Sequence, residues 1–215
     1  MPVPGATAMR IDQIVSVAAV IPVIVLERAA DGVPLARALL AGGLPVLEVT
    51  LRTGAALDGI EAIAREVPQA IVGAGTVLGR ADLEAARSAG ARFAVSPAAT
   101  PELLAAGRAG GLPLLPGVMT PSEVAAAAAA GYDTLKFFPA VQAGGVEMLK
   151  ALAGPFPQVI FCPTGGISLA TAPDYLALPN VCCVGGSWIA PLASIRSHDW
   201  TSITRLASQA RQLRA

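Results

Sequence analysis

The feature that most constrains the fold of this chain is a regular alternation between short apolar runs and segments of helical character. The runs are rich in Val, Ile and Phe, as buried strands are, and the segments between them are rich in Ala and Leu. The apolar runs occupy residues 20–26, 46–51, 71–77, 93–97, 112–118, 134–139, 159–163 and 181–185. Helices are predicted at residues 34–41, 57–66, 81–89, 101–109, 121–130 and 146–153. Strands that alternate with helices predict a parallel sheet.

Eight such runs in 215 residues predict an α/β fold, a (β/α)8 TIM barrel, with an extra helix over about residues 7–18 in front of it. Two helices are predicted to begin where a threonine precedes a proline, at Thr100 and Thr120. The alternative is an open doubly wound sheet, which predicts a glycine-rich nucleotide loop after the first strand. The first run continues into Glu27 and Arg28 without such a loop, and this favours the barrel.

The composition indicates a soluble, cytoplasmic protein. Residues 1–215 contain no Ser-, Gly- or Pro-rich linker, so we expect one domain. Hydrophobic residues make up 54% of the chain, yet no apolar stretch approaches the roughly 20 residues that cross a bilayer. A net charge of zero without a basic cluster argues against nucleic-acid partners. Only 14% of residues are charged, which leaves part of the surface apolar and favours a homo-oligomer.

The three cysteines and the one histidine do not form a recognisable functional set. Cys162, Cys182 and Cys183 lie in apolar runs, and their odd number and spacing fit neither a disulfide framework nor a zinc site. We interpret them as small core residues. His198 stands near the end of the chain, and we interpret it as a surface or loop residue. Because no metal-ligand spacing, dinucleotide fingerprint or Walker loop occurs, no metal or other cofactor is predicted.

Lys136 is the residue that best indicates which reaction this protein could catalyse. The fifteen basic residues comprise two lysines and thirteen arginines, and Lys136 stands inside the apolar run at residues 134–139. A lysine in a desolvating site can lose its proton near neutral pH, whereas an arginine cannot. A neutral lysine amine attacks carbonyl carbon and forms a Schiff base. The alternative is an edge-strand lysine whose stem packs while its head reaches water.

Further polar residues occur near the carboxyl ends of the predicted strands, where barrels hold their sites. The period of two in a strand puts Glu48, Thr50 and Arg52 on one face. Arg52 and the hydroxyl of Thr76 are candidates for a substrate carboxylate, and Glu48 is the candidate general acid and base. The alternative is a buried structural network of Glu48, Arg52 and Lys136.

Two glycine-containing loops predict a phosphate site. They follow the last two strands and precede helical segments, where backbone N–H groups can approach an anion. Loops at these positions commonly bind phosphate in barrels. The residues concerned are Thr164, Gly165, Gly166, Gly185, Gly186 and Ser187. Arg28, after the first strand, is either a further ligand contact or a surface arginine. A phosphorylated substrate is therefore expected.

Taken together and in order, these motifs resemble the family of 2-dehydro-3-deoxy-phosphogluconate (KDPG) aldolase of the Entner–Doudoroff pathway and 4-hydroxy-2-oxoglutarate (KHG) aldolase. The resemblance runs over nearly the whole chain. It is carried by IPVIV at 21–25, LEVTLRT at 47–53, VGAGTVL at 72–78, KFFPA at 136–140, FCPTGGIS at 161–168 and GGSW at 185–188.

The resemblance implies a class I aldolase that needs no metal and forms a homotrimer. Its reaction would be the cleavage of 2-dehydro-3-deoxy-6-phosphogluconate to pyruvate and glyceraldehyde 3-phosphate, with 4-hydroxy-2-oxoglutarate as a second substrate. Lys136 would form the Schiff base, Glu48 would move protons, and Arg52 and Thr76 would hold the pyruvyl portion. The remaining substrate-binding candidates are Pro97, Phe138, Thr164, Gly165, Gly166, Gly185, Gly186 and Ser187.

The chain departs from the family pattern at two places, and other functions stay open. Ala98 stands where a glycine is expected after Pro97, and Val141 and Gln142 stand where some relatives carry an acidic residue. These departures can change the preference for the aldehyde. The alternatives are an aldolase for the 6-phosphogalactonate epimer, a phosphosugar isomerase or epimerase, and a binding protein without catalysis.

Overall fold

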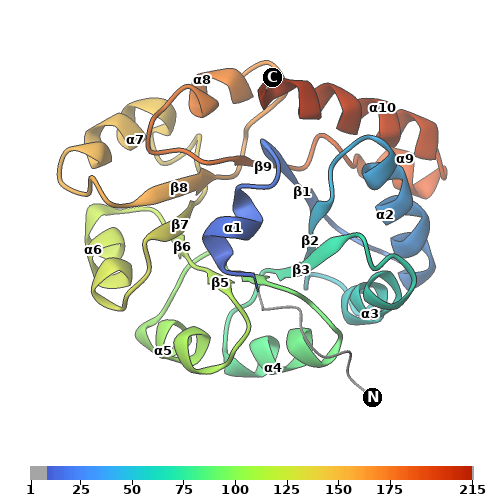
Figure 1. The fold of residues 1–215 in the computed structure, drawn as a ribbon, viewed down its shortest axis with the longest axis horizontal. Helices are drawn as coiled ribbons and strands as arrows, with labels where there is room; N and C mark the ends of the chain where they lie inside the picture. The colour runs from blue at the N-terminus through green and yellow to red at the C-terminus, as the bar shows by residue number, and fades with distance from the viewer. Residues whose placement is uncertain (1–8, 215) are drawn as a thin grey trace.

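The computed structural model describes residues 9–214. Its strands lie at the centre and its helices lie around them (Figure 1). The strands are β1 (Val20–Ile24), β2 (Val46–Thr50), β3 (Ile71–Gly75), β4 (Ala94–Val95), β5 (Leu114–Leu115), β6 (Gly117–Val118), β7 (Thr134–Phe137), β8 (Ile160–Pro163) and β9 (Val184–Gly186). Each lies within or next to one of the predicted apolar runs.

All the strand pairs are parallel, and they form two sheets. One sheet has six strands in the order β5-β4-β3-β2-β1-β9, and the other has three in the order β6-β7-β8. The α/β class and the parallel strands predicted from the sequence are confirmed. The larger sheet curls, and its strands follow one another in chain order from β5 to β1, without the reversal at which an open doubly wound sheet binds its ligand.

The fifth predicted strand, residues 112–118, is divided into β5 and β6. Pro116 lies between the two pieces and has no backbone N–H to give to a ladder. Its carbonyl still accepts a hydrogen bond of 2.9 Å from the backbone N–H of Lys136. Two isolated parallel bridges, Phe161 to Val181 and Thr164 to Gly185, connect the region of β8 with that of β9.

Helices follow the strands as the sequence predicted. They are α1 (Ile11–Val15), α2 (Gly32–Ala41), α3 (Ala56–Glu66), α4 (Arg80–Ser88), α5 (Pro101–Ala109), α6 (Pro121–Ala129), α7 (Gly145–Ala153), α8 (Ala172–Leu176), α9 (Leu192–Arg196) and α10 (Trp200–Arg211), with 3-10 turns η1 (Ala29–Asp31) and η2 (Gln212–Arg214). The predicted caps are confirmed, because the hydroxyl of Thr100 accepts from the N–H of Leu103 and that of Thr120 accepts from the N–H of Glu123.

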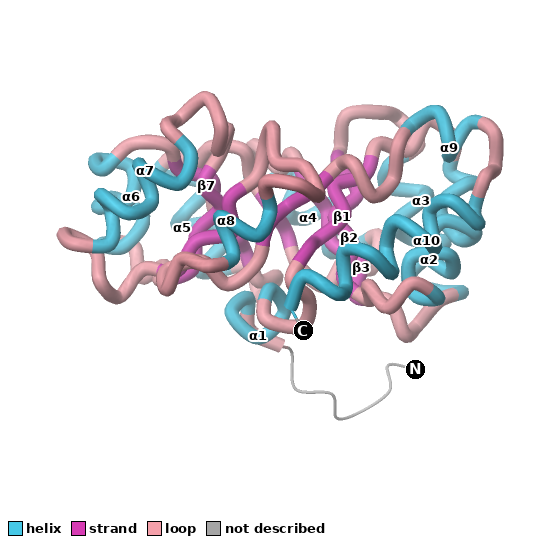
Figure 2. The backbone as a smooth tube through the Cα atoms, turned by 90° about the horizontal axis from the view of Figure 1, so that it is seen from above, coloured by secondary structure: helices cyan, strands magenta, loops and turns pink. Residues whose placement is uncertain are grey.

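The helix predicted over residues 7–18 is shorter in the structure, where α1 ends at Val15. Residues 7 and 8 lie outside the described part of the chain. After Val15 the hydroxyl of Ser16 donates to the carbonyl oxygen of Asp12 at 2.6 Å, a side-chain bond that competes with continued helix. Helix α1 crosses one end of the strands (Figure 2).

The core has two parts. The larger part lies between the strands and the surrounding helices, and the smaller part lies inside the curl of the sheet, where Ile14 and Val15 of α1 pack with residues of several strands. Cys162 and Cys183 belong to this inner part and are buried. Hydrogen bonds with the thiols of Cys162 and Cys182, together with burial, hold the pKa of Cys183 well above its ordinary value. These cysteines therefore serve as core residues, as the sequence suggested.

Candidate active site

Lys136 and Glu48 meet inside the molecule. Lys136 is on β7 and Glu48 is on β2, so the pair joins the smaller sheet to the larger one. The Lys136 Nζ donates a hydrogen bond of 3.1 Å to Glu48 Oε1. The two side chains are only 5% and 4% exposed. The structure thus excludes the solvated edge-strand position for Lys136 that the sequence left open.

A buried pair of this kind is poorly explained by stability alone. Removing two charges from water costs several kcal/mol per ion, roughly as much as their mutual attraction returns. The same geometry is useful for chemistry, because the carboxylate lies within the distance at which it can take a proton from the amine. A lysine amine that can transfer its proton to a neighbouring base is an activated nucleophile.

Glycines on the neighbouring strands make room for this pair. A Cβ atom built at Gly75 would lie 2.3 Å from Glu48 Oε1, so no larger residue fits there while the carboxylate keeps its place. On the other side, Gly117 is the register partner of Lys136, and a Cβ atom there would lie 2.4 Å from the carbonyl oxygen of Pro97. Sequence reasoning did not assign these glycines a role, although the repeated glycines of residues 73–75 were a usable signal.

Phe138 and Ser96 complete the surroundings of the amine. The Lys136 Nζ lies 5.3 Å from the centroid of the Phe138 ring, a distance at which the aromatic face attracts a cation. The buried hydroxyl of Ser96 accepts a hydrogen bond of 3.1 Å from the N–H of Gly117, the partner of Lys136. Pro97, which directly follows Ser96, places its carbonyl group against Gly117 of β6.

The structure corrects the prediction that Glu48, Thr50 and Arg52 lie together on one strand face. Strand β2 ends at Thr50, and Arg52 lies in the turn beyond it with an exposed side chain. Thr50 uses its hydroxyl to donate to the carbonyl oxygen of Ile24 at 2.9 Å. Period-two alternation applies only while the strand continues. The buried network predicted as an alternative consequently lacks Arg52 and consists of Glu48 and Lys136.

Thr76 follows the end of β3 in a backbone conformation that is rare for a threonine. Its φ is +60°, in the left-handed region, and its side chain is partly buried. Such a conformation costs about 1–3 kcal/mol and persists where the surrounding structure enforces it, often at functional sites. The preceding residue is Gly75, which makes room for the Glu48 carboxylate. Thr76 is therefore held at the edge of the Lys136 site.

The loop after β8 lies beside strand β9 itself, so Gly185 and Gly186, which were predicted in a loop, are the last two residues of that strand. Thr164 forms a parallel bridge with Gly185, and a Cβ atom at Gly185 would lie 2.2 Å from the Thr164 hydroxyl oxygen. The N–H of Thr164 donates to the carbonyl oxygen of Phe137 at 2.9 Å, which connects this loop to the end of the strand that carries Lys136. Gly165 and Gly166 have φ values of +106° and +77°, which glycine adopts without strain.

Gly186 ends β9 and Ser187 follows it. Gly186 is buried against the ring of Trp188, while Ser187 is exposed. The structure thus places the loop after β8 next to the end of β7 and connects it, through Thr164 and Gly185, with β9.

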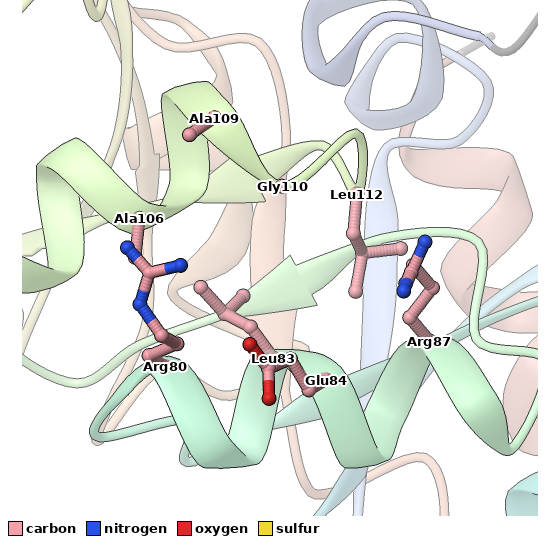
Figure 3. A pocket seen from close by; sticks show the side chains of 8 residues that line it. All are labelled: Arg80, Leu83, Glu84, Arg87, Ala106, Ala109, Gly110 and Leu112. Atoms are coloured by element: carbon pink, nitrogen blue, oxygen red, sulfur yellow. The ribbon is translucent and has the colours of Figure 1, made fainter.

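Hollows elsewhere on the surface offer no comparable chemistry. A cavity of about 200 Å³ lies between α4 and α5, with Leu83 in its middle, Arg80 toward one end, and Leu112 and Arg87 toward the other (Figure 3). Another lies beside α1 and is lined by residues 9–12, 107–108, 111–114 and 131–134. Neither contains Lys136, and within residues 9–214 no three His, Cys, Asp or Glu side chains gather as metal ligands. In the same range no helix has the length and apolarity that crossing a bilayer requires.

An α/β fold that buries a lysine amine against a carboxylate between parallel strands has the arrangement that a lysine-dependent aldolase, a lyase, requires. The family model described as KDPG and KHG aldolase matches residues 11–206. The chain belongs to this family.

Individual relatives agree with this assignment. The chain is 54% identical to 2-dehydro-3-deoxy-phosphogluconate aldolase from Pseudoalteromonas atlantica, over 89% of both chains. It is 52% identical to KHG/KDPG aldolase from Escherichia coli, over 93% of both chains. It is also similar to a crystal structure of KDPG aldolase from Legionella pneumophila that holds pyruvate as a covalent carbinolamine intermediate. The TM-score is 0.92 at 49% identity, over 93% of this chain and 97% of the other.

Proposed function

We propose that this chain is a class I aldolase that cleaves 2-dehydro-3-deoxy-6-phosphogluconate to pyruvate and glyceraldehyde 3-phosphate. It also cleaves 4-hydroxy-2-oxoglutarate to pyruvate and glyoxylate. The observation that carries the proposal is the buried hydrogen bond of 3.1 Å between Lys136 and Glu48. The names of the similar proteins, KDPG aldolase and KHG/KDPG aldolase, support the choice of substrates.

In the first half of the reaction, the neutral amine of Lys136 adds to the C2 carbonyl of the keto acid and gives a carbinolamine. Glu48 supplies the proton with which the C2 oxygen leaves as water, and a protonated imine results. This cation withdraws electrons from the neighbouring bond.

In the second half, the C4 hydroxyl loses its proton, the C3–C4 bond breaks and the aldehyde leaves. The electron pair of that bond forms an enamine of pyruvate on Lys136. Protonation at C3 and addition of water to the imine then release pyruvate and restore the amine. Glu48 is the one buried carboxylate within hydrogen-bond distance of Lys136 Nζ in residues 9–214, so we assign it these proton transfers.

The remaining candidates hold the two anionic ends of the substrate. Arg52 and Thr76 hold the pyruvyl carboxylate, and the exposure of Arg52 leaves its guanidinium available for this contact. Pro97 and Phe138 form the wall of the pocket. The phosphate lies against the segment formed by Thr164, Gly165 and Gly166 and the segment formed by Gly185, Gly186 and Ser187. The N–H of Thr164 is already donated to Phe137, so the donors to the phosphate come from the other residues.

The same proposal includes the fold, the domain organisation and the oligomeric state. Residues 1–215 form one domain, a closed (β/α)8 barrel with α1 over one end, and three copies form a cytoplasmic homotrimer that uses no cofactor. The bridges between the β8 and β9 regions support closure on one side, and the short interruption at Pro116 supports it on the other. The low charge content and the absence of linker composition support the oligomer and the single domain.

Borohydride reduction in the presence of pyruvate tests the proposal. We expect intact mass to rise by one reduced pyruvyl group, and peptide mass to locate the group on Lys136. A folded protein that forms no adduct would contradict the Schiff-base mechanism and leave a phosphosugar isomerase or epimerase as the better candidate. Turnover of the phosphogluconate, phosphogalactonate and hydroxyoxoglutarate substrates, compared on one preparation, then decides among the aldolases.

A further inference from the structure

A cluster of charged side chains outside the Lys136 site connects the loop after β1 with the segment between α9 and α10. Asp31, in η1, lies at its centre with a side chain that is only 7% exposed. The guanidinium of Arg28 donates two hydrogen bonds, of 3.0 and 2.9 Å, to the two Asp31 oxygens. His198 approaches from the other segment and places its Nε2 3.2 Å from Asp31 Oδ1.

His198 remains in contact with this cluster in either protonation form of its Nε2. That nitrogen also contacts the terminal guanidinium nitrogen of Arg28. When the nitrogen carries a proton it donates to Asp31, and when it does not it accepts from Arg28. The connection between the two segments is consequently a fixed feature and not one that depends on the charge of the imidazole.

The backbone at His198 shows that the contact is maintained against strain. Its φ is +56°, in the left-handed region that few residues other than glycine adopt, although histidine, asparagine and aspartate enter it more often than the rest. The imidazole is stacked on Trp200 with ring centroids 5.5 Å apart, and the next residue, Asp199, accepts a hydrogen bond from the N–H of Ser202 and begins α10. A strained residue with three specified contacts indicates a position that the structure requires.

The segment that His198 holds begins at the end of β9, the strand that contains Gly185 and Gly186. Strand β9 pairs with β1, with Gly185 opposite Ile21 and Gly186 opposite Pro22. The carbonyl oxygen of Ser187 then accepts from the N–H of Ala190 at 3.3 Å, and α9 follows. Helix α9 lies at the end of the molecule opposite α1 (Figure 2). The chain from the end of β9 to α10 is therefore held by sheet pairing at its start and by the Asp31 cluster at its end.

A second connection runs parallel to the first. Arg196 donates two hydrogen bonds, of 2.8 and 2.6 Å, to the carboxylate of Glu27. These side chains are exposed, and exposed ion pairs contribute little. The buried carboxylate of Asp31 is the stronger connection, because a buried charge that loses its partners is costly.

We propose that Asp31 and His198 are positioning residues for the substrate's phosphate. By fixing the loop after β1 against the α9–α10 turn, they set where the N–H group of Ser187 points, directly after the part of β9 that the sheet holds. This inference rests on the proposed function, since it requires a phosphate at Ser187. Groups that hold binding residues in place change affinity for the part of the ligand that those residues contact, and leave distant parts unaffected.

Two variants with two substrates test the inference. His198→Asn keeps a residue that accepts the left-handed backbone but is too short to reach Asp31, and Asp31→Asn removes the central charge. For the phosphorylated keto acid we expect KM to rise about fivefold in each variant with little change in kcat, an effect of the size that one lost hydrogen bond produces. The inhibition constant of inorganic phosphate rises in parallel. For 4-hydroxy-2-oxoglutarate, which has no phosphate, kcat/KM stays within about twofold of wild type.

The matched control is Glu66→Gln, which breaks an exposed ion pair with Arg65 at the end of α3 and should leave all these constants unchanged. If the Asp31 and His198 variants lose kcat/KM equally with both substrates, the cluster serves general stability and not phosphate binding. If the variants keep the kinetic constants of wild type, the cluster serves neither phosphate binding nor stability. Each of these results overturns the inference. Pyruvate trapping on wild type reports separately on the proposed function, because trapping at Lys136 involves no phosphate.

Discussion

The two ends of the candidate site are built in different ways. At one end, the buried side chains of Lys136 and Glu48 meet between two sheets at 3.1 Å. At the other end, the loop after β8, with Gly165 and Gly166, lies beside Gly185 of β9 and forms the proposed phosphate site. The difference corresponds to what each end is proposed to do, because covalent chemistry needs an amine held beside a base, whereas a phosphate can be held by the backbone N–H groups that every residue except proline possesses.

This contrast determines how each end can be damaged. At the Lys136 end, a substitution that removes a functional group should remove a chemical step. At the loop end, no side chain needs to be removed, and damage should come from adding atoms or backbone strain where glycine is needed. The predictions below test this distinction, in order of decreasing effect.

Lys136→Arg should abolish activity and pyruvate trapping together. The guanidinium keeps the positive charge beside Glu48 but cannot give up its proton to become a nucleophile. The measurement is borohydride trapping followed by intact mass. Lys150→Arg is a matched control, because Lys150 is the other lysine of the chain and is exposed on α7 beside Glu147. Imine formed by the Lys136 variant would contradict the assignment of the nucleophile.

Glu48→Gln should lower kcat by about 10²-fold or more while pyruvate trapping at Lys136 persists at a lower rate. The amide keeps the shape of the side chain and loses the ability to carry protons. Steady-state turnover and the time course of trapping are the two measurements. Glu147→Gln, on the exposed surface of α7, provides the comparison. A Glu48 variant with the turnover of wild type would require another group to move the protons.

Gly75→Ala should lower kcat by about tenfold without removing any functional group. Its Cβ would lie 2.3 Å from Glu48 Oε1 and 2.7 Å from Cγ, so the carboxylate has to leave its position beside Lys136. Gly79→Ala is the control, because a Cβ atom there meets nothing within 4 Å. If both variants have the turnover of wild type, the exact placement of the Glu48 carboxylate is not important for the reaction.

The sequence was sufficient to predict those parts of the fold and site that depend on local pattern. The alternation of runs gave the parallel α/β class, and Thr100 and Thr120 gave two helix starts that the structure confirms. Lys136 and Glu48 were identified as candidates because charged residues stand out in apolar strands. Their approach to 3.1 Å, across 88 residues of sequence, became visible only in the folded chain.

What the sequence could not predict depends on three-dimensional packing. The prediction that Arg52 shares a strand face with Glu48 was wrong because β2 ends at Thr50, and the alternation of residues alone does not show where a strand ends. Gly75 is the last residue of β3, and its role became visible only when the Glu48 side chain of the adjoining strand β2 was seen to occupy the space beside it. His198 was interpreted as a surface or loop residue, and its contact with Asp31 joins positions 167 residues apart that no periodicity relates.

Gly166→Ala tests the loop end of the comparison and should have the smallest effect. Gly166 has a φ of +77°, and a Cβ atom there would lie 2.8 Å from Val141 Cγ2. Gly111→Ala is a close control, because Gly111 has a φ of +71° but open space around a Cβ atom, far from the site. Both variants should lose about 1–2 kcal/mol of unfolding free energy through the left-handed backbone, measured by urea denaturation.

Only Gly166→Ala should also raise KM for the phosphorylated substrate, by about threefold to tenfold, because only its loop is proposed to bind phosphate. Pyruvate trapping should stay at the level of wild type in both variants, since the Lys136 end is untouched. A Gly166 variant that loses trapping as well would show that the two ends are coupled and would break the distinction between side-chain chemistry and backbone binding. Equal KM values for the Gly111 and Gly166 variants would instead contradict the proposal that the loop after β8 binds the phosphate.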